Sequence, residues 1–578
     1  MPKLTIDNRE VEVPAGATIL DAAEKLGIDI PTLCYLKGRE PATSCLVCLV
    51  KIGQGERLVP ACATRAAAGM EVASETDEVR QARRSALELL LSDHLGDCLA
   101  PCWFACPAEM DIPLMLRQIA AGDLPGAIAT VKARIALPAV LGRICPAPCE
   151  KACRRAALGG AVSICQLKRC VADVDLASPA PYRPACQPAT GRRVAIVGGG
   201  PTGLAAAYYL AQHGHGVTIF EESDRLGGRL VRETSPDVLP REVLEAEIAQ
   251  IARLGIEVRT GCRVGRDVAP AELRRTFDAV LVATGAGSAA QAADWGLPAG
   301  PLGLTVNRQT FAADAAGLFA AGNAIRGKGM VVRSVADGRE ASQSIHQFLS
   351  GQAAPQQPFS TRIGRMEQPE LELLAGLAGK APRGEIPLDA GWDEVAQAAG
   401  GTTQAAGPHG CGADRAPATE VPPPARFARP TLQVAAEQAA RCLHCDCRGL
   451  ASCKLRRYAA LYAADPRRYK TQRRRFQQDA QHAEVIYEPG KCIDCGLCVQ
   501  IAAASGEKLG LAYIGRGFDV RIGVPLGHSL AEALTKVAAQ CVAACPTAAL
   551  AWKDAPSGEI SRKGAKPPGL GGEDEKKM

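Results

Sequence analysis

Cysteine is the residue type with the clearest chemistry in this chain. The sequence contains 24 cysteines, and nearly all of them stand in tight groups. Grouped thiolates are the ligands of iron–sulfur clusters, and a reducing compartment leaves them free to bind metal. The longest stretch between groups carries a glycine-rich nucleotide fingerprint. Together these features predict a protein that carries electrons.

The first cysteine group fits a two-iron cluster. Its members follow a C-x10-C-x2-C-x13-C spacing and are Cys34, Cys45, Cys48 and Cys62. Four thiolates suffice for one [2Fe-2S] cluster. The preceding residues predict a hairpin turning at Asn8 and a helix over 17–26, an order typical of a β-grasp ferredoxin, here over residues 1–76. The wide spacing resembles the N-terminal domain of the large iron–sulfur subunit of respiratory complex I and of NAD-linked hydrogenases.

The next region, residues 77–188, combines helical spacing with two further cysteine groups. Its run 142–153 and its Cys106-Pro107 pair resemble the helical domain of the glutamate synthase small subunit, which holds two [4Fe-4S] clusters. The resemblance implies cluster ligands at Cys102, Cys106, Cys145, Cys149 and Cys153. Cys98, which precedes the first of these groups, is a further candidate ligand.

Six cysteines cannot fill two clusters of four ligands each, so this region needs further ligands. We prefer Cys165 as one of them. His94 and Cys170 remain alternatives, as do a carboxylate ligand and an incomplete cluster.

A dinucleotide fingerprint occupies the middle of the chain. Gly198-x-Gly200-x-x-Gly203 follows a short apolar strand at 192–197 and opens a helix, and the second strand ends at Glu221. The glycines let the backbone approach a pyrophosphate, the start of the helix supplies positive potential, and the acid accepts ribose hydroxyls. This order predicts a Rossmann-like domain.

Later motifs resemble the FAD-binding half of the two-dinucleotide reductase superfamily. They add the cofactor-binding residues Gly228, Thr284, Gly285, Gly322 and Asn323. The resemblance implies bound FAD in a domain over residues 189–352. That superfamily generally has Asp where this chain has Asn323. Because an amide carries no charge, we expect it to raise the flavin potential.

The spacing of these motifs predicts a shortened reductase. In the glutamate synthase small subunit, a second nucleotide domain separates the segments that correspond to Gly285 and Gly317. Here about thirty residues lie between them. A nicotinamide-binding unit needs strand, glycine turn, helix and further strands, which require more chain. We therefore expect no NAD(P) site in this chain.

The C-terminal third begins with an Ala-, Gly- and Pro-rich stretch, residues 353–430, which predicts a linker. Residues 431–484 then carry a dense cysteine group followed by a basic helix. The group consists of Cys442, Cys445, Cys447 and Cys453. Four thiols so close together suit one [4Fe-4S] cluster, with a structural zinc as the alternative.

The last cysteine group predicts a [4Fe-4S] ferredoxin-like domain over residues 485–555. Its ligands are expected at Cys492, Cys495, Cys498 and, before a proline, Cys545. Position 502 is Ala where two-cluster ferredoxins have a fourth cysteine, so a single cluster is expected. The segment resembles electron-transfer segments of complex I and hydrogenases. Residues 556–578 are rich in Gly, Lys and Glu, which predicts a disordered tail.

Composition narrows the class of protein further. No apolar stretch approaches the length of a membrane span, and no secretory leader is evident, so we expect a cytoplasmic protein. A formal net charge of +6 and 4% aromatic residues argue against a general nucleic-acid binder. No Ser-His-Asp set or other catalytic motif is present, and we assign no catalytic residue.

The expected fold is therefore multidomain, α+β and α/β: a β-grasp [2Fe-2S] ferredoxin, an α-helical ferredoxin, a Rossmann-like FAD domain and a C-terminal [4Fe-4S] domain. Its cofactors would be FAD, one [2Fe-2S] cluster and three or four [4Fe-4S] clusters. We expect an electron-transfer subunit of an oxidoreductase. Its partner would be ferredoxin or a subunit of the NADH-oxidising flavoprotein, hydrogenase, formate dehydrogenase or 2-oxoacid oxidoreductase type. The alternative is an autonomous NAD(P)H-dependent reductase like the glutamate synthase small subunit.

Overall fold

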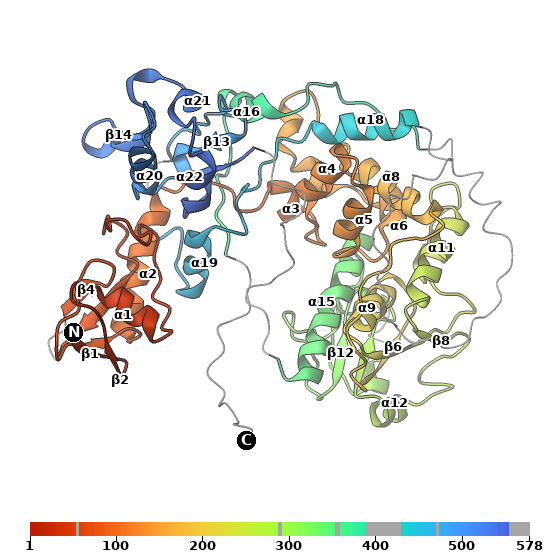
Figure 1. Cartoon of the computed structure of the whole chain (residues 1–578). Coiled ribbons are helices and arrows are strands. Elements are labelled where there is room, and N and C mark those ends of the chain that lie inside the picture. Colours follow the sequence, from red (N-terminus) through yellow and green to blue (C-terminus); the bar gives the residue numbers. More distant parts are fainter. Residues whose placement is uncertain (54–56, 287–291, 353–358, 389–428, 470–472, 554–578) are drawn as a thin grey trace. The chain divides into compact units, whose positions relative to one another are not determined.

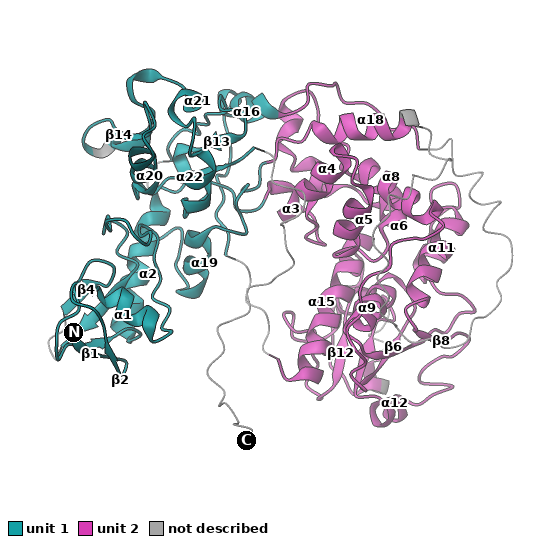
Figure 2. Cartoon of the chain, in the orientation of Figure 1, with its two compact units in different colours: residues 1–99, 357–377, 445–578 teal, residues 100–356, 378–444 magenta. Residues whose placement is uncertain are grey.

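A computed structural model describes residues 1–53, 57–286, 292–352, 359–388, 429–469 and 473–553 (Figure 1). The chain forms two compact units (Figure 2). Unit 1 comprises residues 1–99, 357–377 and 445–578, and unit 2 comprises residues 100–356 and 378–444. None of the helices in the described ranges is long and apolar enough to cross a membrane.

Unit 1 starts with a five-stranded sheet in the order β2-β1-β5-β3-β4. Its elements are β1 (Lys3–Ile6), β2 (Arg9–Glu12), α1 (Ile19–Lys25), β3 (Leu49–Ile52), β4 (Arg57–Pro60) and β5 (Glu71–Ala73). The expected hairpin is present, and its turn residues Asp7 and Asn8 have φ of 47° and 63°, a conformation that Asn and Asp tolerate well. The predicted helix is also present, and Thr18 caps it by accepting from the backbone of Asp21.

The remainder of unit 1 consists of short elements around a second core. They are α2 (Asp77–Ser92), α16 (Gln368–Leu374), η3 (Ala375–Leu377), α19 (Lys454–Leu461), β13 (Val485–Tyr487), η5 (Pro489–Lys491), α20 (Leu497–Ser505), β14 (Ala512–Ile514), η6 (Gly517–Asp519), β15 (Arg521–Gly523), η7 (Pro525–Gly527), α21 (Leu530–Ala533), α22 (Ala538–Ala544) and β16 (Leu550–Trp552). Strand β13 pairs antiparallel with β16, and β14 pairs antiparallel with β15.

Two C-terminal expectations differ from the structure or lie beyond it. The basic helix is shorter than its composition indicates: it ends at Leu461, because Ala463 has a left-handed φ of 49° and Pro466 follows. Part of the expected linker is ordered and contributes α16 to unit 1. Most of the linker, 389–428, and the expected tail, 556–578, lie outside the described residues.

Unit 2 opens with a helical region. Its elements are α3 (Pro101–Ala105), α4 (Ile112–Ala120), α5 (Leu124–Lys132), α6 (Pro138–Ile144), α7 (Pro148–Lys151), η1 (Arg154–Ala157), α8 (Ile164–Ala177) and, later in the chain, α18 (Arg429–Ala440). The expected helical double-cluster domain, 77–188, is therefore divided between the two units, since unit 1 includes residues up to Leu99.

A parallel five-stranded sheet forms the rest of unit 2, in the order β12-β9-β6-β7-β8. Its elements are β6 (Arg193–Val197), α9 (Pro201–Gln212), β7 (Gly216–Phe220), α10 (Arg229–Glu233), α11 (Arg241–Ala252), β8 (Glu257–Arg259), α12 (Pro270–Thr276), β9 (Ala279–Val282), α13 (Ala292–Trp295), β10 (Ala299–Gly300), β11 (Gly303–Leu304), β12 (Leu318–Ala320), α14 (Asn323–Arg326) and α15 (Val331–Ser350). Helices α9 and α15 pack so closely that a Cβ on Gly338 would lie 2.3 Å from the carbonyl oxygen of Thr202. The Rossmann-like expectation is confirmed.

The connection between β9 and β12 is short, as expected. In the described part of this connection, the regular elements are α13 and the two-stranded ribbon β10-β11. These elements do not make the strand-helix-strand unit that a second nucleotide site would need.

Candidate iron–sulfur and dinucleotide sites

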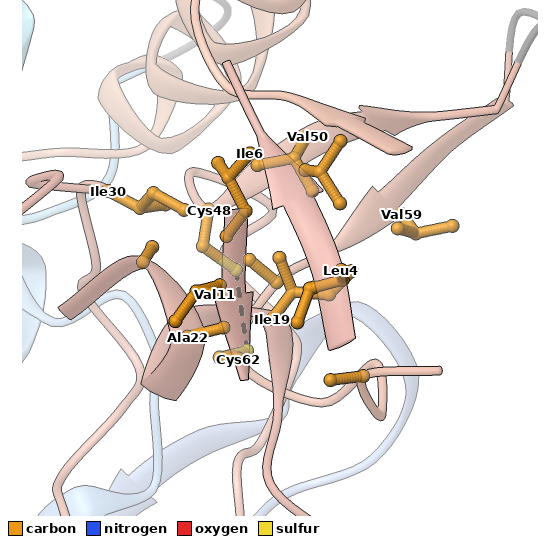
Figure 3. Close-up of a cluster of buried hydrophobic side chains, with 14 of the residues drawn as sticks. Leu4, Ile6, Val11, Ile19, Ala22, Ile30, Cys48, Val50, Val59 and Cys62 are labelled. Carbon is orange, nitrogen blue, oxygen red and sulfur yellow. Dashed lines mark hydrogen bonds between the residues drawn. The ribbon is translucent and has the colours of Figure 1, made fainter. Parts of the chain in front are cut away.

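The first cysteine group comes together as two close pairs. The sulfur atoms of Cys34 and Cys45 lie 3.3 Å apart, as do those of Cys48 and Cys62, and Figure 3 shows the second pair inside the sheet core. All four side chains are buried. The hydrogen bond with Cys45 lowers the pKa of Cys34 to about 5, so one thiolate is available for metal at neutral pH. The pairs can supply two thiols to each iron of a [2Fe-2S] cluster.

The last cysteine group lines a small cavity. Cys492, Cys495, Cys498 and Cys545 all face a space of about 20 Å³. The backbone N–H of Asp494 donates to the sulfur of Cys492 at 3.4 Å, and the N–H of Leu550 donates to that of Cys545 at 3.5 Å. Such donors stabilise negative charge on a cluster sulfur. Cys541 does not line this cavity.

A third thiol set surrounds a buried lysine in unit 2. Lys168 is 3% exposed, and its Nζ lies 3.8 Å from the sulfur of Cys165. The hydrogen bond with Cys165 lowers the pKa of Cys145 to about 6, and the charge of Lys168 acts in the same direction. Burial raises the pKa of Cys149 to about 12, and the thiol of Cys106 adds to this rise.

These interactions favour Cys165 over Cys170 as a ligand. The pKa of Cys170 is raised to about 12 by burial, and the charged groups acting on it are Asp173 and Arg169. The set of Cys106, Cys145, Cys149 and Cys165 therefore has four interacting thiols and one cation.

The other predicted ligands are divided between the units. Cys102, Cys153 and Cys442 belong to unit 2, and Cys98, Cys445, Cys447 and Cys453 belong to unit 1. Among the residues with described positions, no three His, Cys, Asp or Glu side chains form a set for a single metal ion. A cluster of several irons needs its thiolates further apart than one ion does.

A pocket of about 300 Å³ lies at the carboxyl ends of β6, β7 and β9. The predicted cofactor residues that line it are Gly198, Gly200, Glu221, Gly228, Thr284, Gly285 and Asn323. The start of α9 opens into it, as a bound pyrophosphate requires. The residues present therefore fit a dinucleotide.

Gly203 and Gly322 act next to this pocket through their lack of a side chain. A Cβ on Gly203 would lie 2.0 Å from the carbonyl oxygen of Gly198, and one on Gly322 would lie 2.1 Å from Oγ1 of Thr202. Both positions thus keep the glycine turn and the last flavin-type segment close together.

Glu221 is held in place at the end of β7. It is 4% exposed, Oε2 accepts from the N–H of Gly199 at 2.7 Å, and Oε1 accepts from the N–H of Ser223 at 2.9 Å. Each oxygen keeps acceptor capacity for a ribose hydroxyl.

Sequence reasoning missed several residues that line the pocket. Arg232 and Arg263 bring positive charge to it, and Trp295 contributes an aromatic side chain. Arg263 lies four residues after the end of β8 and belongs to no spacing that marks a nucleotide site, so no motif identified it.

Helix α15 connects the pocket with the thiol set in unit 2. Val331 and Ser334 line the pocket, and between them Arg333 donates to the carbonyl oxygen of Pro107 at 3.5 Å. Pro107 directly follows Cys106. Six residues further along the same helix, Arg339 pairs with Glu109 at 3.5 Å. The dinucleotide pocket and the thiol set therefore share a structural support.

Comparisons with known families confirm the three domain types. Residues 2–77 match a 2Fe-2S iron–sulfur cluster binding domain, residues 74–179 match dihydropyrimidine dehydrogenase domain II, 4Fe-4S cluster, and residues 196–249 match an NAD(P)-binding Rossmann-like domain. The chain thus combines two kinds of iron–sulfur domain with a dinucleotide domain.

Curated relatives include oxidoreductase subunits. The NADP(+)-dependent formate dehydrogenase subunit beta of Moorella thermoacetica is 40% identical over 207 residues, covering 32% of this chain and 29% of the relative. The NADPH-Fe(3+) oxidoreductase subunit beta of Geobacter sulfurreducens is 38% identical over 192 residues, covering 32% and 28%.

The glutamate synthase [NADPH] small chain of Bacillus subtilis is 40% identical over 149 residues, covering 26% of this chain and 30% of the relative. The expected resemblance to that family is confirmed. The chain spans less than a third of the length of each of these three relatives.

Proposed function

We propose that this chain is an FAD and iron–sulfur electron-transfer subunit of a multi-subunit oxidoreductase. The observation that carries the proposal is the connection through α15, which lines the dinucleotide pocket and contacts the residue after Cys106. A flavin and a cluster must lie near each other to exchange electrons, and this helix fixes their supports within one unit.

FAD is the dinucleotide that the pocket favours. Thr284 and Gly285 from the end of β9 and Asn323 from the start of α14 converge on the same space. These are the positions at which the reductase resemblance implies contacts to FAD. Bound FAD would accept two electrons and release them singly to clusters.

The residues of the pocket have separable roles in holding that cofactor. Glu221 would accept ribose hydroxyls, the N-terminus of α9 would face the pyrophosphate, and Arg263 would add positive charge. The glycines allow the backbone to approach without side chains in the way.

We assign one [2Fe-2S] cluster to the first cysteine group. One [4Fe-4S] cluster is assigned to the cavity of Cys492, Cys495, Cys498 and Cys545, and another to the set around Lys168. The remaining thiols would hold one or two more, which gives three or four [4Fe-4S] clusters in total. All cysteines in the described ranges are free thiols, which supports a reducing, cytoplasmic location.

The partner would supply the substrate chemistry. Two of the relatives are named as beta subunits, one of a formate dehydrogenase and one of an Fe(3+) oxidoreductase. A partner of the formate dehydrogenase, hydrogenase, NADH-oxidising flavoprotein or 2-oxoacid oxidoreductase type, or ferredoxin, fits an electron-transfer chain of this kind.

An autonomous NAD(P)H-dependent reductase is the second candidate function. The match of residues 196–249 to a family described as NAD(P)-binding favours it. In that case NADH or NADPH alone would reduce the purified chain.

Anoxic purification of the full chain distinguishes the two functions. The electron-transfer proposal expects bound FAD, iron and sulfide, co-purifying oxidoreductase subunits, and a flavin absorption band that persists when NADH or NADPH is added to the isolated chain. Dithionite should bleach the band and give EPR signals from the clusters. Stoichiometric bleaching by NADH or NADPH alone would support the reductase instead.

A further inference from the structure

Two loops that are far apart in the sequence meet within unit 1. The loop after α2 contains Cys98, and the loop before α19 contains Cys447 and Cys453. The backbone N–H of Cys447 donates to the carbonyl oxygen of Cys98 at 3.3 Å. The contact brings cysteines from two predicted groups to one place.

All three thiols are removed from solvent. Cys98 is 7% exposed, and Cys447 and Cys453 are each 8% exposed. The pKa of Cys453 is raised to about 12, chiefly by burial and further by the neighbouring thiols of Cys447 and Cys98 and by that of Cys545. The three thiol groups are thus close enough to interact.

The surroundings provide donors for charged sulfur. The backbone N–H of Thr361 donates to the sulfur of Cys98 at 3.4 Å, and that of Arg456 donates to the sulfur of Cys453 at 3.4 Å. Thr361 also donates its hydroxyl to the carbonyl oxygen of Gly96 at 2.7 Å, which fixes the loop. Backbone donors of this kind favour metal-bound thiolates.

A histidine nitrogen on the first loop has no partner. Nδ1 of His94 is buried and has no hydrogen bond. The ring folds back over its own loop, since a Cβ on Gly96 would lie 3.1 Å from Nε2 of His94. A buried imidazole nitrogen without a partner is costly unless a ligand uses it, and neutral imidazole is a common metal ligand.

We propose that Cys98, Cys447 and Cys453, with His94 as a nitrogen ligand, hold one [4Fe-4S] cluster in unit 1. This assignment separates Cys98 from Cys102 and Cys106, and Cys447 and Cys453 from Cys442. This assignment depends on the proposed function only in taking the metal group to be an iron–sulfur cluster. Its tests count iron atoms and record EPR spectra of the chain, so they need neither a partner nor a substrate.

A double-mutant comparison in the full chain tests the thiol set. Cys98→Ser and Cys447→Ser should each remove the same EPR signal from the dithionite-reduced protein, with a loss of roughly four iron atoms per chain. The double variant should lose no more iron than either single variant, because both residues serve one cluster. A double variant that loses roughly eight iron atoms would overturn the proposal.

Two controls keep this result interpretable. Cys541→Ser changes another buried cysteine of unit 1 and should leave all signals in place. The [2Fe-2S] signal should persist in every variant, which shows that unit 1 has folded. If the chain contained no iron–sulfur cluster of any kind, all signals would be missing from the unaltered protein, and the proposed function would fail first.

Pulsed EPR tests the histidine. The signal lost in Cys98→Ser should show a strong nitrogen coupling in the unaltered protein. His94→Cys should abolish the coupling and retain the iron, whereas His528→Gln, an exposed histidine of unit 1, should change neither. Absence of the coupling in the unaltered protein would remove His94 from the ligand set.

Discussion

The two units place their sulfur atoms in different surroundings. In unit 1, thiols from three predicted groups share one apolar core with Leu33, Leu87 and Leu455; these thiols are Cys34, Cys45, Cys453 and Cys495. In unit 2, the thiol set surrounds the buried ammonium of Lys168 and lies beside a dinucleotide pocket. If the proposed clusters and cofactor are bound, unit 1 would pass electrons between buried clusters, and unit 2 would exchange them with the cofactor.

The candidate two-iron site of unit 1 has its four thiols in two different cores. Cys48 and Cys62 belong to the core of the N-terminal sheet, whereas Cys34 and Cys45 belong to the core shared with Cys453 and Cys495. Cys48 and Cys62 therefore fix the site to the N-terminal sheet. Cys34 and Cys45 instead share a core with thiols of the other two groups.

The difference also concerns how charge on a cluster is stabilised. Within unit 1, the described hydrogen-bond donors to sulfur are mainly backbone N–H groups, such as those of Thr361 and Arg456. The buried ammonium of Lys491 also acts on a thiol of this unit, that of Cys447, but it is paired with the carboxylate of Glu488. Within unit 2, a full cation lies at 3.8 Å from Cys165. Cluster potentials in unit 2 should therefore respond more strongly to single charge changes.

The largest effect should come from adding a methyl group beside the glycine turn of the nucleotide pocket in unit 2. In Gly203→Ala the new Cβ would lie 2.0 Å from the carbonyl oxygen of Gly198, so the strand and helix must separate. We expect the purified variant to hold less than about a tenth of the normal flavin, while the [2Fe-2S] EPR signal of unit 1 persists. Gly216→Ala meets only ordinary contacts at 3.6 Å and should keep its flavin. Equal loss of both centres would show that the units depend on each other.

The next effect concerns the stability of unit 1. Glu370 is 5% exposed and accepts hydrogen bonds from Arg473 at 2.7 and 2.8 Å. These bonds lower its pKa to about 2. Because the pKa is depressed in the folded state, the stabilisation is present above about pH 4.5 and is lost as the pH falls toward 2.

Glu370→Gln should therefore reduce the free energy of unfolding by about 3 kcal/mol at pH 7, and the gap should narrow below pH 4.5. Urea titrations followed by circular dichroism at pH 7, 4 and 3 measure this. Glu372→Gln, on the exposed side of the same helix, should show little change at any pH. A gap that does not vary with pH would contradict the ionic origin.

A third change tests the role of charge in unit 2. Lys168→Met removes the buried cation beside Cys165, which would stabilise the extra electron of the proposed cluster in its reduced state. We expect the potential of that cluster to fall by about 2 kcal/mol, or roughly 90 mV for one electron. Lys168→Arg retains the charge and should shift the potential less. Redox titration followed by EPR gives both values, and unchanged clusters in unit 1 would confirm that the effect is local.

The features that could be predicted from sequence are those whose residues are close together in the chain. The fingerprint that ends at Gly203 lies within one strand-turn-helix, and the [2Fe-2S] group lies within one small domain. Short spacings limit the possible geometries, so residue type and spacing were enough. The same holds for Glu221, which follows its strand directly.

Contacts between distant segments could not be predicted in this way. Thr361 belongs to a stretch whose composition indicates a linker, yet it bonds to the sulfur of Cys98. The contact between Cys98 and Cys447 depends on how unit 1 folds as a whole. Each of the two also lies close in sequence to other cysteines, so the sequence predicted that each belongs to a local ligand group. Arg263 was missed because only the fold brings it to the pocket.

The smallest effect should come from a single atom exchange at the pocket. Asn323 lines the pocket at the start of α14, where the reductase superfamily generally has Asp. Asn323→Asp adds a negative charge that opposes the anionic reduced flavin. We expect the flavin potential to fall by about 1 kcal/mol, or roughly 20 mV for two electrons, as measured by spectroelectrochemistry.

The direction of the shift in flavin potential tests whether charge controls the redox chemistry of unit 2. If charge controls redox chemistry in unit 2, Asn323→Asp and Lys168→Met should both lower a potential there, since one adds a negative charge and the other removes a positive charge. The EPR midpoint potential of the [2Fe-2S] cluster should be unaltered in both variants. A flavin potential that does not move in Asn323→Asp would show that residue 323 acts through hydrogen bonding alone.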